Sequence, residues 1–321
     1  MTRWLDRWQV GLYVLALGVG AAVGLVVPAT APVAAEAINP VLIVLLYVTF
    51  LSVPMMKLGQ AVRDGRFVLS LLVLNFLIVP VVVYGLSRFV ADSPALLIGV
   101  LLVLLSPCID YVIVFSSLAG AAHERLLAAT PLLMLLQMVL LPVYLRLFLG
   151  PGLFDVIDIS PFIEAFLLLI ALPLGLAAIT QYLAARATTA RKIMSHLQAL
   201  MVPLMMLTLA VVVASQINAV TSGLGSLITV IPIYIGFLIV MIPLGIVMSR
   251  LFHHDTPAAR ATVFSGATRN SLVVLPLALA LPEPLALAAV VVVTQTLIEL
   301  VGMVVYVRLI PRLVAEPQMR A

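Results

Sequence analysis

The stretch SPCID at residues 106–110 interrupts an apolar run, residues 95–119, with a proline, the only cysteine of the chain and a carboxylate. A second interruption, ATRNS at residues 267–271, directly follows Gly266 within another apolar run, residues 260–281. A charge at the centre of a membrane costs roughly 3 kcal/mol on insertion scales, so such residues normally face a protein interior or an aqueous pathway. The two interruptions therefore predict a protein that moves a solute across a membrane.

The composition supports a membrane protein. Hydrophobic residues make up 64% of the 321 residues, charged residues make up 9%, and the mean hydropathy is +1.28. A soluble domain would be about half apolar and about a quarter charged. We predict one all-α integral membrane domain over residues 1–321, because ten segments reach the roughly 20 apolar residues that a span needs. These segments are residues 10–28, 37–56, 67–88, 95–119, 126–149, 161–183, 197–217, 227–249, 260–281 and 285–307.

The basic residues indicate topology rather than a nucleic-acid partner. Of the 17 Lys and Arg residues, Arg88 and Arg146 fall on one side of a ten-helix threading, Arg269 lies within a span, and the rest fall on the other side. By the positive-inside rule, the richer side is cytoplasmic. We predict a multi-pass protein of the cell membrane (inner or plasma membrane) with both termini in the cytoplasm. The N-terminal apolar run is long enough to span, so we interpret it as a helix rather than a signal peptide.

Ten helices divide into two halves of five, approximately residues 1–150 and 155–315. An odd number per half makes the second half enter from the opposite side, which is the inverted repeat common in secondary transporters. The two interruptions fall in the fourth helix of each half, at equivalent depth. Paired breaks of this kind are the best sequence indicator of a transporter site, so we expect helices 4 and 9 to be broken and to cross near the midplane.

Pro107 and Gly266 are the predicted helix breaks. Pro107 lacks a backbone donor and disfavours helix before it, and Gly266 tolerates unusual dihedral angles. Two unwound helices would present half-helix N-termini with partial positive charge and bare carbonyls with partial negative charge at the midplane. Such a crossing can bind a solute and a coupling ion. A proline kink with a polar packing contact is the alternative.

Four ionisable or soft side chains are the main candidates for function. Cys108 would begin the second half of helix 4, where a helix N-terminus favours the thiolate, a ligand for soft metals and metalloids; an inert buried cysteine is the alternative. Asp110 and Arg269 form either a buried ion pair or two groups with separate roles. Glu299 shares a helix face with Gln295. A carboxyl at this depth suits a proton carrier, or a protonated hydrogen bond between helices.

The predicted site therefore has two sets of residues. Substrate-binding candidates are Cys108, Arg269, Asn270 and Ser106, and ion-coupling candidates are Glu299, Asp110, Gln295 and Thr268. Asn75 and Gln137 are expected to form hydrogen bonds between helices. We expect no metal site, no cofactor and no enzymatic activity, because the sequence lacks HExxH, GxGD and phosphate-binding glycine motifs.

These motifs resemble the bile acid/sodium symporter superfamily and, within it, the arsenite efflux permeases of the arsenical-resistance type. The resemblance runs through nearly the whole chain as ten helices in two inverted halves. Its specific parts are SPCIDYVIVF at residues 106–115, ATRNS at 267–271 and TLIEL at 296–300. In those permeases the helix 4 cysteine and the helix 10 glutamate are tied to transport, which implies these roles for Cys108 and Glu299. The resemblance also implies export of trivalent arsenite, and sometimes antimonite, in exchange for protons.

Two residues depart from that pattern. Asp110 stands where those permeases have a neutral residue, and Arg269 stands where sodium-coupled relatives usually have a neutral amide. A fixed positive charge at Arg269 could replace a sodium ion. The sequence leaves two interpretations: proton-coupled arsenite efflux, and sodium-coupled uptake of a small organic anion bound at the half-helix N-termini and Arg269. The expected partners are the lipid bilayer, a small inorganic or organic solute, and protons or sodium, with no nucleic acid.

Overall fold

The structure is a computed structural model that describes residues 2–52, 64–109, 111–154, 164, 167–222 and 224–315, and these residues contain helices and no strands. Two π-helical segments, residues 74–78 and 167–171, continue into α5 and α10. The α-helices are α1 (Thr2–Val26), α2 (Ala31–Ser52), α4 (Gly65–Val73), α5 (Val79–Ser87), α6 (Pro94–Leu104), α7 (Tyr111–Leu118), α8 (His123–Phe154), α10 (Leu172–Arg186), α11 (Thr188–Gln198), α12 (Met201–Ser222), α13 (Leu224–Leu227), α14 (Val230–Leu251), α15 (Thr256–Ala267), α16 (Ser271–Leu279) and α17 (Leu287–Leu313).

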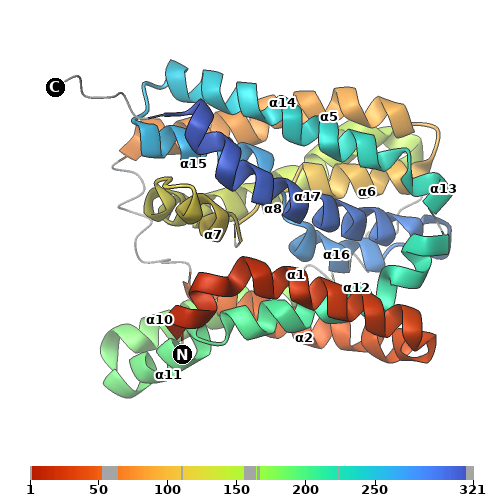
Figure 1. Cartoon of the computed structure of the whole chain (residues 1–321), viewed down its shortest axis with the longest axis horizontal. Coiled ribbons are helices and arrows are strands. Elements are labelled where there is room, and N and C mark those ends of the chain that lie inside the picture. The colour runs from red at the N-terminus through yellow and green to blue at the C-terminus, as the bar shows by residue number, and fades with distance from the viewer. Residues whose placement is uncertain are drawn as a thin grey trace.

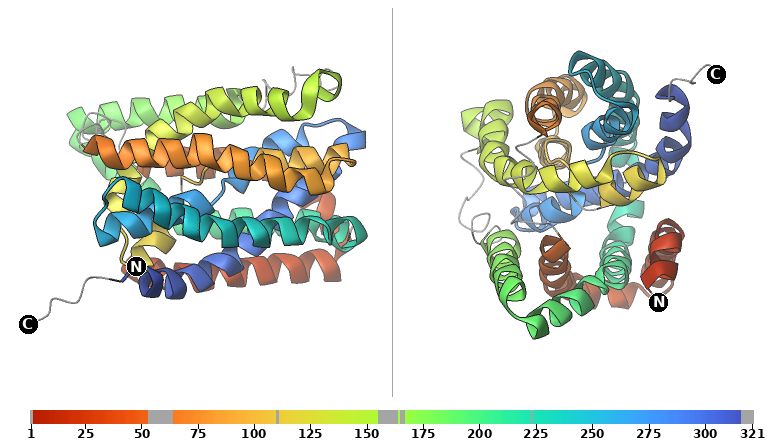
Figure 2. Two further views of the ribbon diagram at one scale, coloured as in Figure 1. Left: turned by 90° about the horizontal axis from the view of Figure 1, so that it is seen from above. Right: turned by 90° about the vertical axis from the view of Figure 1, so that its left-hand side faces the viewer.

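The helices form two groups. Helices α1, α2, α10 and α12 pack on one another and form the lower layer of Figure 1, whereas α14, α15, α16 and α17 pack with α6, α7 and α8 in a larger bundle above it. The long helices run along one common direction, as the left view of Figure 2 shows. Helix α1 begins and α17 ends at the same end of the molecule, as an even number of crossings requires.

The helices have the length and surface of a multi-pass membrane protein. Within the described residues, six helical segments are long and apolar enough to cross a membrane. Their outward faces carry exposed side chains such as Val81, Ile239 and Val301. Contact of these apolar side chains with water would be unfavourable, whereas lipid tails solvate them. Each of the ten predicted segments contains described helix. Exactly ten spans, the inverted repeat and the orientation of the termini stay predictions.

Both predicted interruptions separate two helices. The fourth segment divides into α6, which ends at Leu104, and α7, which begins at Tyr111. The ninth divides into α15, which ends at Ala267, and α16, which begins at Ser271. Our placement of the second break at Gly266 was wrong, because Gly266 is the penultimate residue of α15. Its lack of a side chain serves packing instead, since an added Cβ would lie 2.7 Å from the side chain of Leu74.

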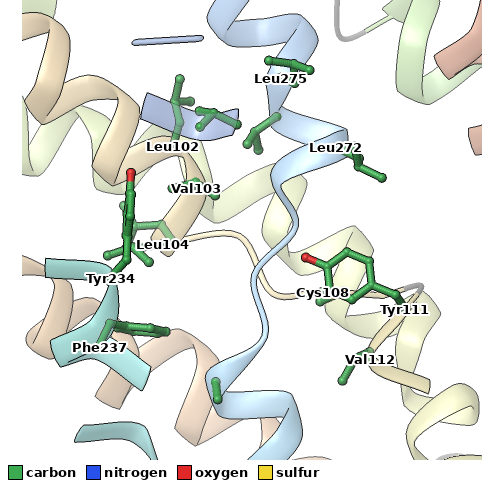
Figure 3. Close-up of a cluster of buried hydrophobic side chains, with 14 of the residues drawn as sticks. Leu102, Val103, Leu104, Cys108, Tyr111, Val112, Tyr234, Phe237, Leu272 and Leu275 are labelled. Carbon is green, nitrogen blue, oxygen red and sulfur yellow. The ribbon is translucent and has the colours of Figure 1, made fainter. Parts of the chain in front are cut away.

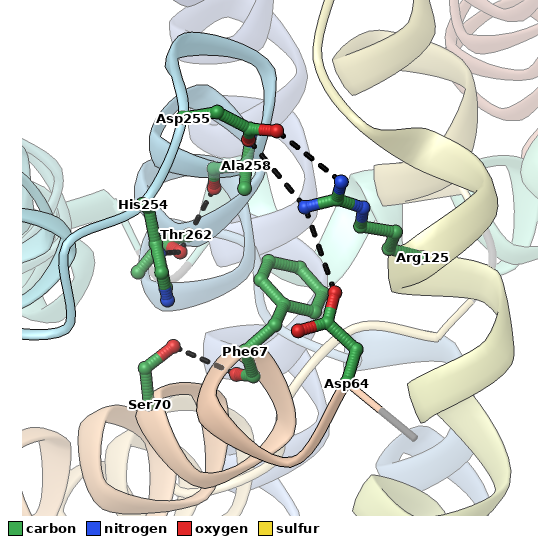
Figure 4. Close-up of polar contacts among 8 residues, drawn as sticks. All are labelled: Asp64, Phe67, Ser70, Arg125, His254, Asp255, Ala258 and Thr262. Carbon is green, nitrogen blue, oxygen red and sulfur yellow. Dashed lines mark hydrogen bonds and ion pairs between the residues drawn. The ribbon is translucent and has the colours of Figure 1, made fainter. Parts of the chain in front are cut away.

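A polar cluster fixes the start of α15 (Figure 4). Asp255 caps the helix, and its Oδ1 accepts a hydrogen bond of 3.0 Å from the backbone N–H of Ala258. Arg125, at the start of α8, forms ion pairs of 3.2 Å with Asp255 and 3.5 Å with Asp64. Burial lowers the pKa of the neighbouring His254, which favours its neutral form in this corner. The cluster therefore links the starts of α4, α8 and α15.

We expect the cap to contribute more to stability than the exposed ion pairs. Asp255→Ala removes the capping acceptor, which typically costs about 1 kcal/mol, whereas exposed ion pairs contribute about 0–1 kcal/mol. The apparent melting temperature of the purified protein should fall by about 2 °C. Asp255→Asn is the matched control, because it keeps a capping oxygen and loses the charge. If Asp255→Asn is as unstable as Asp255→Ala, the ion pairs dominate instead.

Candidate functional site

The two interruptions meet as extended backbone at the centre of the larger bundle. An isolated antiparallel bridge pairs Pro107, between α6 and α7, with Arg269, between α15 and α16. Figure 3 shows the two extended stretches crossing between their half-helices, with Cys108 and Tyr111 beside the crossing. A proline is tolerated at this bridge because the hydrogen bonds fall on its neighbours rather than on its own nitrogen. The predicted crossing of the two broken helices is therefore present in the fold.

Each interruption satisfies backbone groups of the other. The N–H of Cys108 donates to the carbonyl of Thr268 at 3.2 Å, and the N–H of Asn270 donates to the carbonyl of Ser106 at 2.8 Å. Unpaired backbone groups at this depth would cost several kcal/mol each. The paired stretches can therefore stay non-helical inside the membrane domain, and we refer to residues 106–108 and 268–270 as the crossing.

The guanidinium of Arg269 fills the space between two half-helix C-termini. Its side chain is fully buried, and Nη2 donates to the carbonyls of Ser265 and Gly266 at 2.7 Å each, near the end of α15. Nη2 also donates to Oδ1 of Asn75 at 2.8 Å, and Nη1 reaches the carbonyl of Leu104 at 3.4 Å, at the end of α6. Helix C-termini carry partial negative charge, and the positive guanidinium of Arg269 lies against two of them.

The predicted ion pair between Asp110 and Arg269 stays a prediction, because Asp110 lies outside the described residues. Asn75 makes the interhelical contact that we expected: its amide donates to Ser265 Oγ at 3.0 Å and its carbonyl oxygen receives Arg269. No sequence pattern indicated that Asn75 would also contact the buried arginine.

Glu299, on α17, lies against the other side of the crossing and is 1% exposed. Its carboxyl accepts the backbone N–H of Arg269 at 2.9 and 3.1 Å, the hydroxyl of Tyr111 at 2.8 Å, and the side-chain amide of Gln295. The contact with Gln295 confirms that these two residues share a helix face. Three donors converge on one carboxyl, so the site stabilises the ionised form while burial opposes it.

Tyr111 is a site residue that sequence reasoning missed. It is the first residue of α7, and its hydroxyl lies 2.8 Å from Glu299 Oε1 and 2.8 Å from the carbonyl oxygen of Arg269. The available signal was its position three residues after Cys108, on the first turn beyond the break. From this position, at the start of α7, Tyr111 brings a hydroxyl group to the crossing.

Cys108 lies within the crossing and is 1% exposed. Our expectation that it begins a half-helix was wrong, because α7 starts three residues later, at Tyr111. The backbone at Cys108 is instead extended, and its N–H donates to the carbonyl of Thr268. Its thiol is therefore placed at the centre of the crossing rather than at a helix N-terminus.

Comparison with known proteins identifies the family. Residues 39–223 match the model of the Sodium Bile acid symporter family, which is more than half of the chain. The chain belongs to this family. Its members are membrane transporters rather than enzymes. No curated protein matches the chain.

The family match covers the first interruption and ends before the second. It includes residues 106–110 but not residues 267–271 or Glu299. Arg269 and Glu299, two of the candidate site residues, therefore lie outside the matched part of this symporter-family protein.

Ser106 and Thr268, two further predicted site residues, use their hydroxyls within their own helices. The hydroxyls of Ser106 and Thr268 donate back to their own helices, to Leu102 at 2.8 Å and Phe264 at 2.7 Å. These two residues therefore contribute carbonyls rather than hydroxyls to the crossing. A buried serine that donates to its own helix is not available to a solute in this conformation.

Asn270 and Gln295 each hydrogen-bond through one side-chain polar atom and not through the other, among the described residues. Asn270 Oδ1 caps α16 by accepting the N–H of Val273 at 3.2 Å, and Gln295 Nε2 donates to Glu299. Asn270 Nδ2 and Gln295 Oε1 are buried and lack a hydrogen-bond partner within the described part of the chain. Such groups are expensive to bury unless something binds them. A donor and an acceptor are thus available near the crossing for a polar solute.

Proposed function

We propose that this protein is a proton-coupled secondary transporter that exports arsenite, and its heavier analogue antimonite, from the cytoplasm. The observation that carries the proposal is the guanidinium of Arg269 on the carbonyls of Ser265 and Gly266, with Glu299 buried on the other side of the same residue. The substrate, the direction and the coupling ion are proposals, whereas membership of a transporter family is established above.

Sodium is disfavoured as the coupling ion by electrostatics. Carbonyls of broken helices commonly hold a coupling cation in secondary transporters. A sodium ion placed about 4 Å from the guanidinium would meet a repulsion of about 4 kcal/mol at an effective dielectric constant near 20. Arg269 is part of the chain and fully buried, so its positive charge cannot leave the site as a bound ion can. Glu299 is the buried carboxylate of the described chain, so it is the group we assign to carry the proton.

Arsenite fits the groups near the crossing. The thiol of Cys108 is a soft ligand, and soft ligands suit metalloids. Arsenite is a neutral acid with hydroxyl groups that can both donate and accept, which matches the open donor of Asn270 and the open acceptor of Gln295. One thiol gives a weak site, as a carrier that must release its cargo requires.

A sodium-coupled symporter of a small organic anion is the second candidate. The family match favours it, since the matching family is described by sodium and bile acid transport. In that case the anion would bind at the N-termini of α7 and α16, and a sodium site away from Arg269 would be required.

Transport by purified protein in lipid vesicles separates the two candidates. We expect labelled arsenite to move when a pH gradient is imposed and to be unaffected when sodium is replaced by choline. Uptake of an organic anion that stops without sodium would overturn the proposal and establish the second candidate.

Arg269→Gln tests whether the arginine stands in for a cation. Removing it leaves the carbonyls of Ser265 and Gly266 without their donor, which should destabilise the protein by about 3–5 kcal/mol and stop transport. A cation that binds the vacated site should restore stability, by about 2.7 kcal/mol at 100 times its Kd. The apparent melting temperature of the variant should therefore rise with sodium chloride relative to choline chloride, and that of wild type should not.

Two controls accompany this experiment. Arg146→Gln removes an exposed arginine and should leave the protein insensitive to sodium. Arg269→Lys keeps the charge and should fold without sodium if Arg269→Gln fails to fold. A wild-type protein that is stabilised by sodium as strongly as Arg269→Gln would contradict the assignment.

A further inference from the structure

A single hydroxyl hydrogen at Tyr111 faces two acceptors. The oxygen lies 2.8 Å from Glu299 Oε1 and 2.8 Å from the carbonyl oxygen of Arg269. One O–H group makes one strong hydrogen bond at a time. Which acceptor it serves must therefore depend on the protonation state of Glu299.

We propose that Tyr111 is a positioning residue that switches its hydrogen between Glu299 and the Arg269 carbonyl, so that a proton and a hydroxyl-bearing solute compete for the crossing. The proposal rests on the proposed function, because it takes Glu299 as the proton carrier. It adds a residue, a coupling device and a substrate class, namely solutes that carry a hydroxyl donor.

The ionised state follows from the hydrogen bonds. When Glu299 carries its negative charge, the hydroxyl of Tyr111 donates to it, because charged acceptors make the stronger hydrogen bonds. The carbonyl of Arg269 then loses this donor. The backbone bonds of the crossing do not replace it, since they run from Cys108 to Thr268 and from Asn270 to Ser106. A buried carbonyl is thereby open to a donor supplied by the solute.

The protonated state reverses the arrangement. The proton resides on Glu299 Oε1, and the acid O–H donates to the oxygen of Tyr111. The hydroxyl hydrogen of Tyr111 turns to the carbonyl of Arg269, which needs no further donor. Tyr111 keeps its own proton in both states. The only net change between them is the proton that Glu299 gains. Proton binding closes the acceptor that a solute hydroxyl would use, which is the condition for exchange rather than symport.

Other groups near Glu299 do not supply the same switch. The charged or titratable groups around it are the guanidinium of Arg269, the thiol of Cys108 and the hydroxyl of Tyr306. The guanidinium is held by the carbonyls of α15. The hydroxyl of Tyr306 donates to the carbonyl of Leu238, on α14. Asp110 lies outside the described residues. Tyr111 is therefore the group whose two acceptors lie on the carboxyl and on the crossing.

A solute-free measurement tests the switch in the purified protein. Infrared difference spectra between acidic and alkaline pH should contain a protonated-carboxyl band that Glu299→Gln removes. In Tyr111→Phe the band should move to higher frequency, because the acid O–H loses its acceptor. Tyr234→Phe is the matched control, since its buried hydroxyl donates to the carbonyl of Val291 and should not affect the band.

Arsenite binding measured across pH tests the competition. For one proton that weakens solute binding, the wild-type Kd should rise about tenfold for each unit of pH decrease below the protonation midpoint, until it reaches the weaker value of the protonated state. In Tyr111→Phe the Arg269 carbonyl stays open in both states, so the change should fall below about threefold per unit. An unmoved infrared band and a retained tenfold dependence in Tyr111→Phe would overturn the switch. A carboxyl band that survives Glu299→Gln would instead remove the proton carrier, and with it the proposed function.

Discussion

Replacing Glu299 with glutamine is expected to abolish transport driven by a pH gradient while arsenite still binds. Glutamine keeps the size of the side chain and can still accept the N–H of Arg269, so the crossing should remain folded. Glutamine cannot take up or release a proton. No described His lies inside the bundle to take over this role. The glutamine amide resembles the protonated acid, so binding should equal the weaker wild-type value at acidic pH and should not vary with pH.

Vesicles containing purified protein give the measurement. Wild type should accumulate labelled arsenite against its gradient, and Glu299→Gln should reach no more than equilibrium. Glu124→Gln, an exposed carboxyl at the start of α8, is the control for loss of a negative charge. If Glu299→Gln accumulates arsenite as wild type does, the proton is carried elsewhere, and Asp110 becomes the next residue to test.

Replacing Cys108 with alanine is expected to abolish arsenite resistance in a sensitive host while the protein still reaches the membrane. The thiol lies buried at the crossing, and in the proposed mechanism it is the soft ligand for arsenic. Alanine also removes a buried atom, which costs of order 1 kcal/mol in a packed core. That penalty is too small to remove the protein from the membrane, so loss of resistance would report chemistry rather than folding.

Cys108→Ser separates the two effects. Serine restores most of the volume and offers an oxygen, a weaker ligand for arsenic, so it should retain partial resistance. Membrane levels of all three proteins should be equal within about twofold, because a loss near 1 kcal/mol is a small part of a typical stability. Full resistance in Cys108→Ala would exclude the thiol mechanism and favour the organic-anion transporter.

The breaks could be predicted because their chemistry is local. Pro107 cannot donate a backbone hydrogen bond, and charged or amide side chains at residues 269 and 270 cannot face lipid, whatever the rest of the fold. The pairing of Gln295 with Glu299 was equally predictable, because four residues along a helix return to the same face. The membrane location follows from such local signals repeated along the chain.

The assignments within the breaks could not be predicted. The sequence offered Asp110 as the partner of Arg269, yet the described contacts of its guanidinium are with carbonyls and with Asn75, which lies 194 residues away. Tyr111 reaches the carbonyl of a residue 158 positions away and Glu299, 188 positions away. Gly266 was expected to unwind α15 but packs against Leu74 from another helix. None of these partners shares a helix with the residue it contacts.

An all-helical membrane protein with two polar interruptions, a buried thiol and a buried carboxyl could be predicted from the residues alone, because lipid solvates apolar side chains and excludes charge regardless of partners. The fold was needed to show that the interruptions pair with each other, that Arg269 reaches Asn75, and that Tyr111 joins Glu299 to the crossing. The two kinds of feature differ in how far along the chain the interacting residues lie. Hydropathy and helix periodicity act over a few residues, whereas a hydrogen bond between helices requires two distant segments to be placed within about 3 Å of each other.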